Sequence, residues 1–154
     1  MQLNALYPFF EDKKFFGLKR KENKIKRDPT QRYDERKRNN ISNVISGGIY
    51  KTILDDSHPI GLGYGTNYYT LKRSAMAYSL LEKGINVSYI PEGATAIAGF
   101  VGKNVANAQE KSLIIGSEPI GKGSVSYFVD NPIFRSFWEN GKLLLFNSVF
   151  LNTN

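Results

Sequence analysis

Gly121-Lys-Gly-Ser-Val-Ser-Tyr-Phe-Val-Asp-Asn-Pro-Ile-Phe-Arg-Ser-Phe-Trp-Glu-Asn-Gly-Lys-Leu-Leu-Leu-Phe-Asn-Ser-Val-Phe150 contains a strand pattern, a turn and an aromatic helix pattern in one unbroken run. Residues 124–129 predict a strand, and Asp130-Asn131-Pro132 predicts the turn that follows it. We expect the last helix to begin at Pro132 or Phe134. Its apolar spacing predicts these inward side chains: Phe137, Trp138, Leu144, Leu145, Phe146, Val149 and Phe150. The run therefore predicts a strand–turn–helix unit at the end of an α/β domain.

The sequence before this run alternates between short strand and helix patterns. Gly, Pro, Asn and Asp separate the expected strands, which are 48–54, 68–72, 86–90, 95–99 and 113–116. Helices are expected over 3–16, 30–38 and 104–110, the second of them highly charged. This order of elements favours an α/β or α+β sandwich in which helices cover a central sheet. We divide the chain into an N-terminal helix and basic arm over 1–41 and an α/β domain over 42–154.

Positive charge is concentrated in the basic arm, which spans residues 13–38. This arm carries twelve Lys or Arg against four Asp or Glu, so its own net positive charge exceeds the net charge of +7 for the whole chain. Such a block can attract nucleic acid or an anionic membrane. However, residues 19–28 contain no aromatic side chain for base stacking, so the pattern favours a solvated linker over a nucleic-acid site.

The chain contains neither a membrane span nor a secretory signal by sequence criteria. No stretch approaches the roughly 18 to 20 apolar residues that cross a bilayer. The first twelve residues lack the basic start, apolar run and small-residue cleavage site of a signal peptide. We therefore expect this chain, expressed alone, to stay in the cytoplasm.

The run from Gly121 to Phe150, together with Ile45–Tyr64 and Tyr68–Lys72, resembles the C-terminal region of bacterial zinc carboxypeptidase-like proteins of the M14 type. The resemblance implies a partial glutamine-amidotransferase-like (flavodoxin-like) sandwich, with helices packed on a central mixed sheet and N-terminal strands of that fold missing before Met1. It also implies a non-catalytic accessory domain, whose partner is the catalytic peptidase domain of a metallocarboxypeptidase exported to the periplasm or cell surface. A fold does not fix a function, so the chemistry has to be sought in the residues.

The catalytic chemistry of such a parent protein cannot be built from these residues. A catalytic zinc needs three protein ligands, whereas His58 is the one histidine and has no Glu three residues after it. The nucleophilic Cys of an active amidotransferase is missing, because the chain has no cysteine. We therefore expect no catalytic residue, metal or cofactor in this chain. Zinc is implied only for the separate catalytic domain of the parent.

One glycine pattern imitates a phosphate-binding loop. Gly116, Gly121 and Lys122 have the spacing of that motif. However, Gly123 stands where a Ser or Thr hydroxyl would meet magnesium, and the sequence after it predicts a strand where the motif requires a helix. We interpret the segment as a hairpin between two strands.

His58 and the pair formed by Asp130 and Arg135 are candidate site residues, each with a structural alternative. His58 has the titration range of a ligand-binding residue or general base, but its place before Pro59 favours a role in a turn. Asp130 can cap the helix that follows it. Arg135 can clamp Asp130 or the carboxylate of a ligand. Capping accounts for the spacing and is the favoured interpretation.

An aromatic platform is the remaining candidate site. The glycine-rich loop over 61–65 contains Tyr64 and is followed closely by Tyr68 and Tyr69. Trp138, the single tryptophan, is the fourth aromatic residue of this platform. If these side chains line a concave pocket, the chain is a stand-alone module that binds a sugar or a peptide. Burial of the same side chains in the core would argue against that function.

Overall fold

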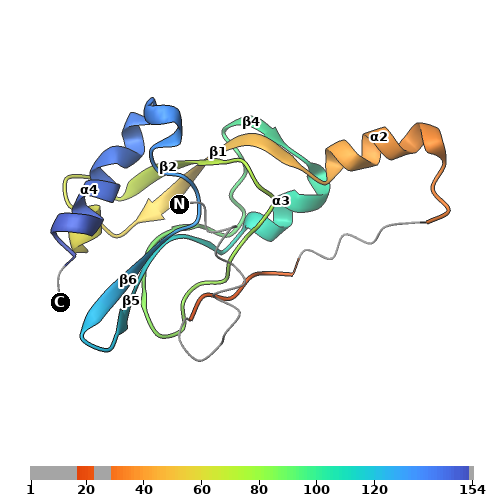
Figure 1. The fold of residues 1–154 in the computed structure, drawn as a ribbon. Coiled ribbons are helices and arrows are strands. Elements are labelled where there is room, and N and C mark those ends of the chain that lie inside the picture. The colour runs from red at the N-terminus through yellow and green to blue at the C-terminus, as the bar shows by residue number, and fades with distance from the viewer. Residues whose placement is uncertain (1–16, 23–28, 153–154) are drawn as a thin grey trace.

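A computed structural model of the chain describes residues 17–22 and 29–152 (Figure 1). The helix expected over 3–16 lies outside the described residues, as does part of the basic arm. Within them the fold is α/β, with a curled antiparallel sheet of six strands and a few short helices. No helix in the described residues is long and apolar enough to cross a membrane.

The sheet has the strand order β2-β1-β3-β5-β6, and β4 pairs with β1 off this path. The strands are β1 (Ile45–Leu54), β2 (Asn67–Lys72), β3 (Ile85–Ile90), β4 (Ala98–Val101), β5 (Ser112–Ile120) and β6 (Gly123–Phe128). The helices are α2 (Tyr33–Ser42), α3 (Lys103–Gln109) and α4 (Lys142–Phe150), with 3-10 turns η1 (Pro59–Gly61), η2 (Phe134–Ser136) and η3 (Glu139–Gly141). The order leaves β2 and β6 at opposite ends of the main path of the sheet.

The prediction of a mixed sheet is wrong for the described strands, because every pairing among them is antiparallel. A parallel pair needs a crossover of about a dozen residues or more, usually containing a helix. In the described part of the chain, α3 is the one α-helix between two strands, and it joins β4 to β5, which do not pair. The expected hairpin around Gly121 is confirmed, because β5 pairs with β6 up to Ile120 and Gly123.

Polar side chains enter the interior on the first two strands. Alternate residues of β1 and β2 are buried, as the two-residue repeat of a strand requires. The inward set includes Thr52, Thr70 and Lys72, each at most 1% exposed. The register places Thr70 opposite Tyr50 and Lys72 opposite Gly48. The inner face of this sheet is therefore partly polar on β1 and β2.

Two hydrophobic clusters make up the core. The larger one joins the sheet to η1 and α4 and contains Tyr50, Leu54, Ile60, Tyr68, Val87, Ile90, Ile114, Ile115 and Leu144. The second contains Leu18, Tyr78, Leu81, Leu113 and Tyr127.

The first described segment, residues 17–22, is packed on the body of the domain, where the sequence pattern favours a solvated linker. Leu18 is only 4% exposed, and the backbone N–H groups of Lys21 and Ser79 donate to the carbonyls of Ala77 and Lys19. The hydrophobic side chain of Leu18 and these strand-like bonds outweigh the solvation of the neighbouring charges.

The last helix begins at Lys142, several residues later than the sequence pattern predicts. Positive φ angles at Arg135 (49°) and Ser136 (59°) interrupt any continuous helix from Pro132. The predicted inward face is wrong for four of its seven side chains, which are more than half exposed: Phe137, Phe146, Val149 and Phe150. Leu144 alone is fully buried, while Trp138 and Leu145 are half-buried.

The helix α4 contacts the body through a narrow stripe. The side-chain amide of Asn147 is buried and donates to the carbonyls of Ile60 (3.0 Å) and Leu62 (2.8 Å). With Leu144 it joins α4 to η1, whereas Leu143, Phe146, Val149 and Phe150 of the same helix are exposed. A short helix beside a 3-10 turn thus buries fewer side chains than a helix lying across a sheet.

Candidate functional site

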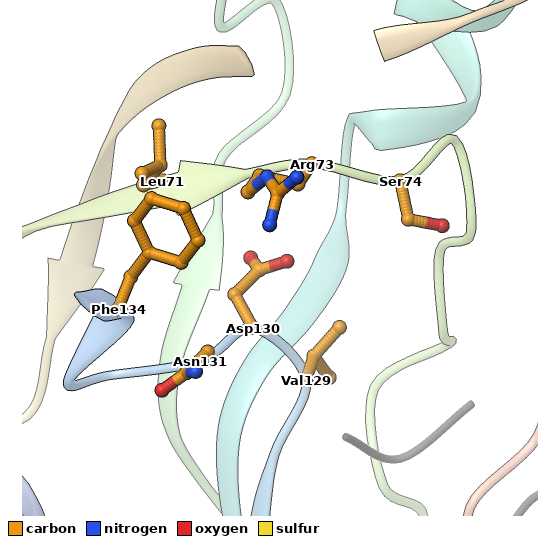
Figure 2. Close-up of a pocket in the computed structure, with 7 residues that line it drawn as sticks. All are labelled: Leu71, Arg73, Ser74, Val129, Asp130, Asn131 and Phe134. Atoms are coloured by element: carbon orange, nitrogen blue, oxygen red, sulfur yellow. The ribbon is translucent and has the colours of Figure 1, made fainter. Parts of the chain in front are cut away.

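A cavity of about 180 Å³ lies where the segments after β2 and β6 meet (Figure 2). Its wall is formed by Leu71, Arg73, Ser74, Val129, Asp130, Asn131 and Phe134. In Figure 2 the carboxylate of Asp130 points from one wall towards the guanidinium of Arg73 on the other. Two segments far apart in the sequence therefore supply opposing charged groups to one small space.

Asp130 connects the two outer strands of the curled sheet. It follows β6, and its Oδ2 accepts a hydrogen bond of 2.9 Å from the Oγ1 of Thr70 in β2. The same oxygen lies 3.5 Å from the Nζ of Lys72. A side chain at the end of β6 thus bonds to β2, the strand at the far end of the sheet order.

Lys72 is an unusual residue for the interior of a sheet. Its side chain is 0% exposed, and that of Asp130 is 10% exposed. The Nζ of Lys72 has no hydrogen-bond partner in the part of the chain that the structure describes. Buried ammonium groups normally have their protons bonded, because the loss of hydration is costly. Asp130 supplies the opposite charge, but the donors of Lys72 are left unused.

The aromatic ring of Phe134 holds two guanidinium groups at the edge of the cavity. The Cζ of Arg73 lies 4.6 Å from the ring centroid, and the Cζ of Arg135 lies 5.2 Å from it. Attraction between a cation and the face of a ring acts over this range. Phe134 therefore orients two positive charges without neutralising them.

The backbone beside Phe134 is strained. Arg135 and Ser136 adopt left-handed φ angles of 49° and 59°, which residues with a Cβ rarely use. Each such residue costs on the order of 1–3 kcal/mol, and strained residues tend to cluster at functional sites. The strain, the cavity and the buried ammonium occur at the same end of the sheet.

The predicted site residues fall into two groups in the structure. Asp130 lines the cavity, and Arg135 reaches its edge through Phe134. Tyr68 lies behind them in the core, and burial, reinforced by the charge of Asp130, raises its pKa well above the usual value. Asp130 does not cap a helix. Its carboxylate bonds to Thr70 instead, because the helix expected at Pro132 is not formed.

His58 lies away from the cavity and shapes a turn. It is 8% exposed, and its Nδ1 accepts a hydrogen bond of 3.2 Å from the backbone N–H of Ile60 at the start of η1. Burial lowers the pKa of His58, against an opposing effect of the Asp55 charge. The favoured role of His58 in a turn agrees with this geometry.

The four aromatic residues of the expected platform do not line one pocket. Tyr68 is 2% exposed, whereas Tyr69 is 39% exposed because successive residues of β2 point to opposite faces. Tyr64 is half-buried, packs edge-on against Tyr68 and donates its hydroxyl proton to the carbonyl of Asn140. Trp138 is half-buried before η3. The side chain of Tyr64 joins the loop before β2 to the segment before α4, and that of Tyr68 is part of the core.

Thr70, Lys72, Arg73 and Phe134 are the functional candidates that the sequence reasoning missed. One signal was present, since the alternation in Tyr68-Tyr-Thr-Leu-Lys72 places the lysine on the same face as a buried tyrosine. A lysine that points into the interior is normally paired with a buried group of opposite charge. The sequence offers no means of choosing Asp130 as that partner, because the contact spans the whole sheet.

Comparisons of the chain with protein-family models, with curated proteins and with solved structures found no significant match. Within the described residues, no three His, Cys, Asp or Glu side chains lie together in a way that could hold a metal ion.

Replacing Asp130 by asparagine should strongly destabilise the fold. Asp130→Asn keeps an oxygen that can accept from Thr70 but leaves the Lys72 ammonium buried without an opposite charge. We expect the free energy of unfolding to fall by about 3–5 kcal/mol, as for other buried pairs that lose one partner. Urea denaturation near neutral pH measures the change. Adding Lys72→Met should recover most of the loss, and simple additivity of the two substitutions would contradict the account.

Acid should destabilise the wild type more than a His58→Asn variant. The pKa of His58 is lowered in the fold, so the unfolded chain, in which imidazole titrates near 6.5, takes up the proton first as the pH falls. Stability should therefore decrease below about pH 6.5. The asparagine side chain of the variant keeps an oxygen that can accept from Ile60 but does not titrate. Urea unfolding at several pH values compares the two proteins, and parallel losses would show that His58 does not contribute.

Proposed function

We propose that the chain is a non-catalytic binding module for a peptide or a sugar, with its ligand entering the cavity between the ends of β2 and β6. The observation that carries the proposal is the buried Lys72, whose unused donors lie behind Asp130 in the cavity wall. A buried ion pair contributes little to stability by itself. A buried ion pair that lies beside a cavity and a strained backbone is typical of a functional site.

The cavity suits one residue or one sugar unit better than a whole ligand. Its volume of about 180 Å³ is below that of pockets for drug-sized molecules, which begin at roughly 300 Å³. Apolar side chains from Leu71, Val129 and Phe134 share the wall with polar groups of Arg73, Ser74 and Asn131. This mixture is typical of sites that hold an apolar group and fix its orientation by a few polar contacts.

Binding is favoured over catalysis because neither a cysteine nor a histidine lies among the residues that line the cavity. The chain has no cysteine, and its single histidine lies at η1 with Nδ1 engaged by the backbone.

A titration followed by amide NMR tests this function. Short peptides and neutral oligosaccharides are added to the labelled chain, and we expect chemical-shift changes in Arg73, Ser74, Asn131 and Phe134. The variant Ser74→Phe fills the cavity and should abolish these changes, whereas Ser46→Phe on the exposed face of β1 is the matched control. Shifts that cluster elsewhere, or that survive Ser74→Phe in a folded variant, would contradict the proposal.

We also propose, as a second candidate, that the module is an accessory domain of a larger zinc carboxypeptidase-like protein. The resemblance of Ile45–Tyr64, Tyr68–Lys72 and the run from Gly121 supports this relationship. The exposed apolar residues of α4 favour it further, because Leu143, Phe146, Val149 and Phe150 would be covered by a catalytic peptidase domain. The role would be to present substrate or to support that domain.

The coding sequence upstream of Met1 tests this second candidate. An in-frame extension that carries His-x-x-Glu and a signal peptide is expected if the module belongs to an exported peptidase. An in-frame stop codon directly upstream, together with a ribosome-binding site, would contradict the accessory-domain proposal and leave the binding module as a separate protein.

A further inference from the structure

We infer that the ligand places in the cavity a free carboxylate together with an apolar side chain, as the C-terminal residue of a peptide does. The inference rests on the proposed binding function and narrows it to one ligand chemistry. It is drawn from the charges around the cavity, the orientation of Arg73 and the apolar part of the wall.

The cations at this end of the sheet outnumber the anions. Lys72 lies 3.5 Å from the carboxylate of Asp130, Figure 2 shows that carboxylate pointing towards Arg73, and Arg135 packs on the ring of Phe134. Asp130 is already engaged by Thr70 and lies beside Lys72. The charges of the two arginines are therefore available to a ligand.

Arg73 is the residue best placed to bind an anion. It lines the cavity, and among the described residues it forms no ion pair and no side-chain hydrogen bond. Its guanidinium is oriented by stacking on Phe134 at 4.6 Å. A guanidinium held in this way loses little freedom when a carboxylate accepts two parallel N–H bonds.

A neutral sugar fits this wall less well than a carboxylate does. Sugars stack on open aromatic faces, but the ring of Phe134 already carries the guanidiniums of Arg73 and Arg135. A phosphate also fits less well, because Asp130 in the same wall repels the two negative charges of a phosphate more strongly than the one charge of a carboxylate. One negative charge therefore matches the site best.

The apolar wall indicates what the carboxylate is attached to. Leu71 and Val129 line the cavity together with Phe134, and they offer contact to an aliphatic or aromatic side chain. Ser74 and Asn131 provide polar atoms on the same wall, where a peptide N–H and C=O could bond. A C-terminal residue presents the carboxylate, the apolar side chain and the N–H within the space of one amino acid, and the residue before it supplies the C=O.

The direct test compares the two end groups of one peptide. The probes are acetyl-Gly-Ala-Leu with a free C-terminus and the same peptide with a C-terminal amide, titrated by calorimetry and amide NMR. The free acid should bind at least about tenfold more tightly, because charge-assisted bonds to Arg73 contribute on this scale. Equal affinity of acid and amide at the cavity would overturn the carboxylate inference and leave the binding module intact.

Variants of Arg73 test the same point independently. Arg73→Gln should weaken binding of the free acid about tenfold or more and leave the amide unchanged, while Arg73→Lys should fall between wild type and Arg73→Gln. Arg36→Gln, on the exposed helix α2, is the matched control and should leave both affinities unchanged. Loss of acid and amide binding to the same extent in a folded Arg73→Gln variant would contradict a contact with the carboxylate.

Competition distinguishes the source of the negative charge. Isovalerate, glucuronate and inorganic phosphate are added to the complex with the free-acid peptide. We expect isovalerate to compete weakly and the other two to compete less. Stronger competition by phosphate or glucuronate than by isovalerate would overturn the proposed ligand, and absence of any shift at the cavity with all probes would overturn the binding function as well.

Discussion

The carboxylate of Asp130 holds the curled sheet together where β2 and the end of β6, the two ends of the strand order, approach each other. Thr70 donates to it from β2, and the ammonium of Lys72 lies 3.5 Å away. Asp130 belongs to the chain that leaves β6, so one side chain links two strands that are far apart in the strand order. The path of the chain after β6, including Phe134 and the strained turn at Arg135, is positioned by this contact.

The same contact explains why a lysine can occupy the interior. Because side chains alternate along β2, Tyr68, Thr70 and Lys72 all point inward, and the third of them needs an opposite charge. Asp130 provides it, but a pair of this kind contributes little net stability, since both ions lose their hydration. The unused donors of Lys72 and the guanidinium of Arg73 give this end of the sheet a positive charge. The proposed preference for a carboxylate follows from that charge.

Local patterns in the sequence were sufficient for the strands but not for the segment between β6 and α4. The strands other than β4 overlap most of their expected ranges, because alternation and turn residues act over a few neighbours, whereas the strand expected over 95–99 overlaps β4 only at residues 98 and 99. The helix after Asp130 was predicted too early, because Asn131 and Pro132 are equally suited to a turn, where the Oδ1 of Asn131 accepts from the N–H of Ile133. Asp130 lines the cavity and Arg135 packs on Phe134 beside it, but Asp130 does not have the capping role that its sequence position favours.

The partners of these residues could not be found from the sequence. Lys72 lies in β2 and Asp130 follows β6, the two strands at opposite ends of the strand order. Their contact therefore depends on how the whole sheet curls. The prediction of an inward face for α4 was wrong for a related reason, since only Leu144 packs into the core cluster and Asn147 bonds to η1, while Phe146, Val149 and Phe150 are exposed. In both cases the tertiary packing determines which side chains are buried together, and the local sequence does not distinguish between the alternatives.

Native-state hydrogen exchange tests the role of Asp130 most directly. In a denaturant series on the wild-type chain, the ladder amides of β2 and β6 are compared for their free energy of opening and its denaturant dependence. If Asp130 joins the two outer strands, both should open in one cooperative step with the same free energy. Opening of β2 at a clearly lower free energy than β6 would contradict the account.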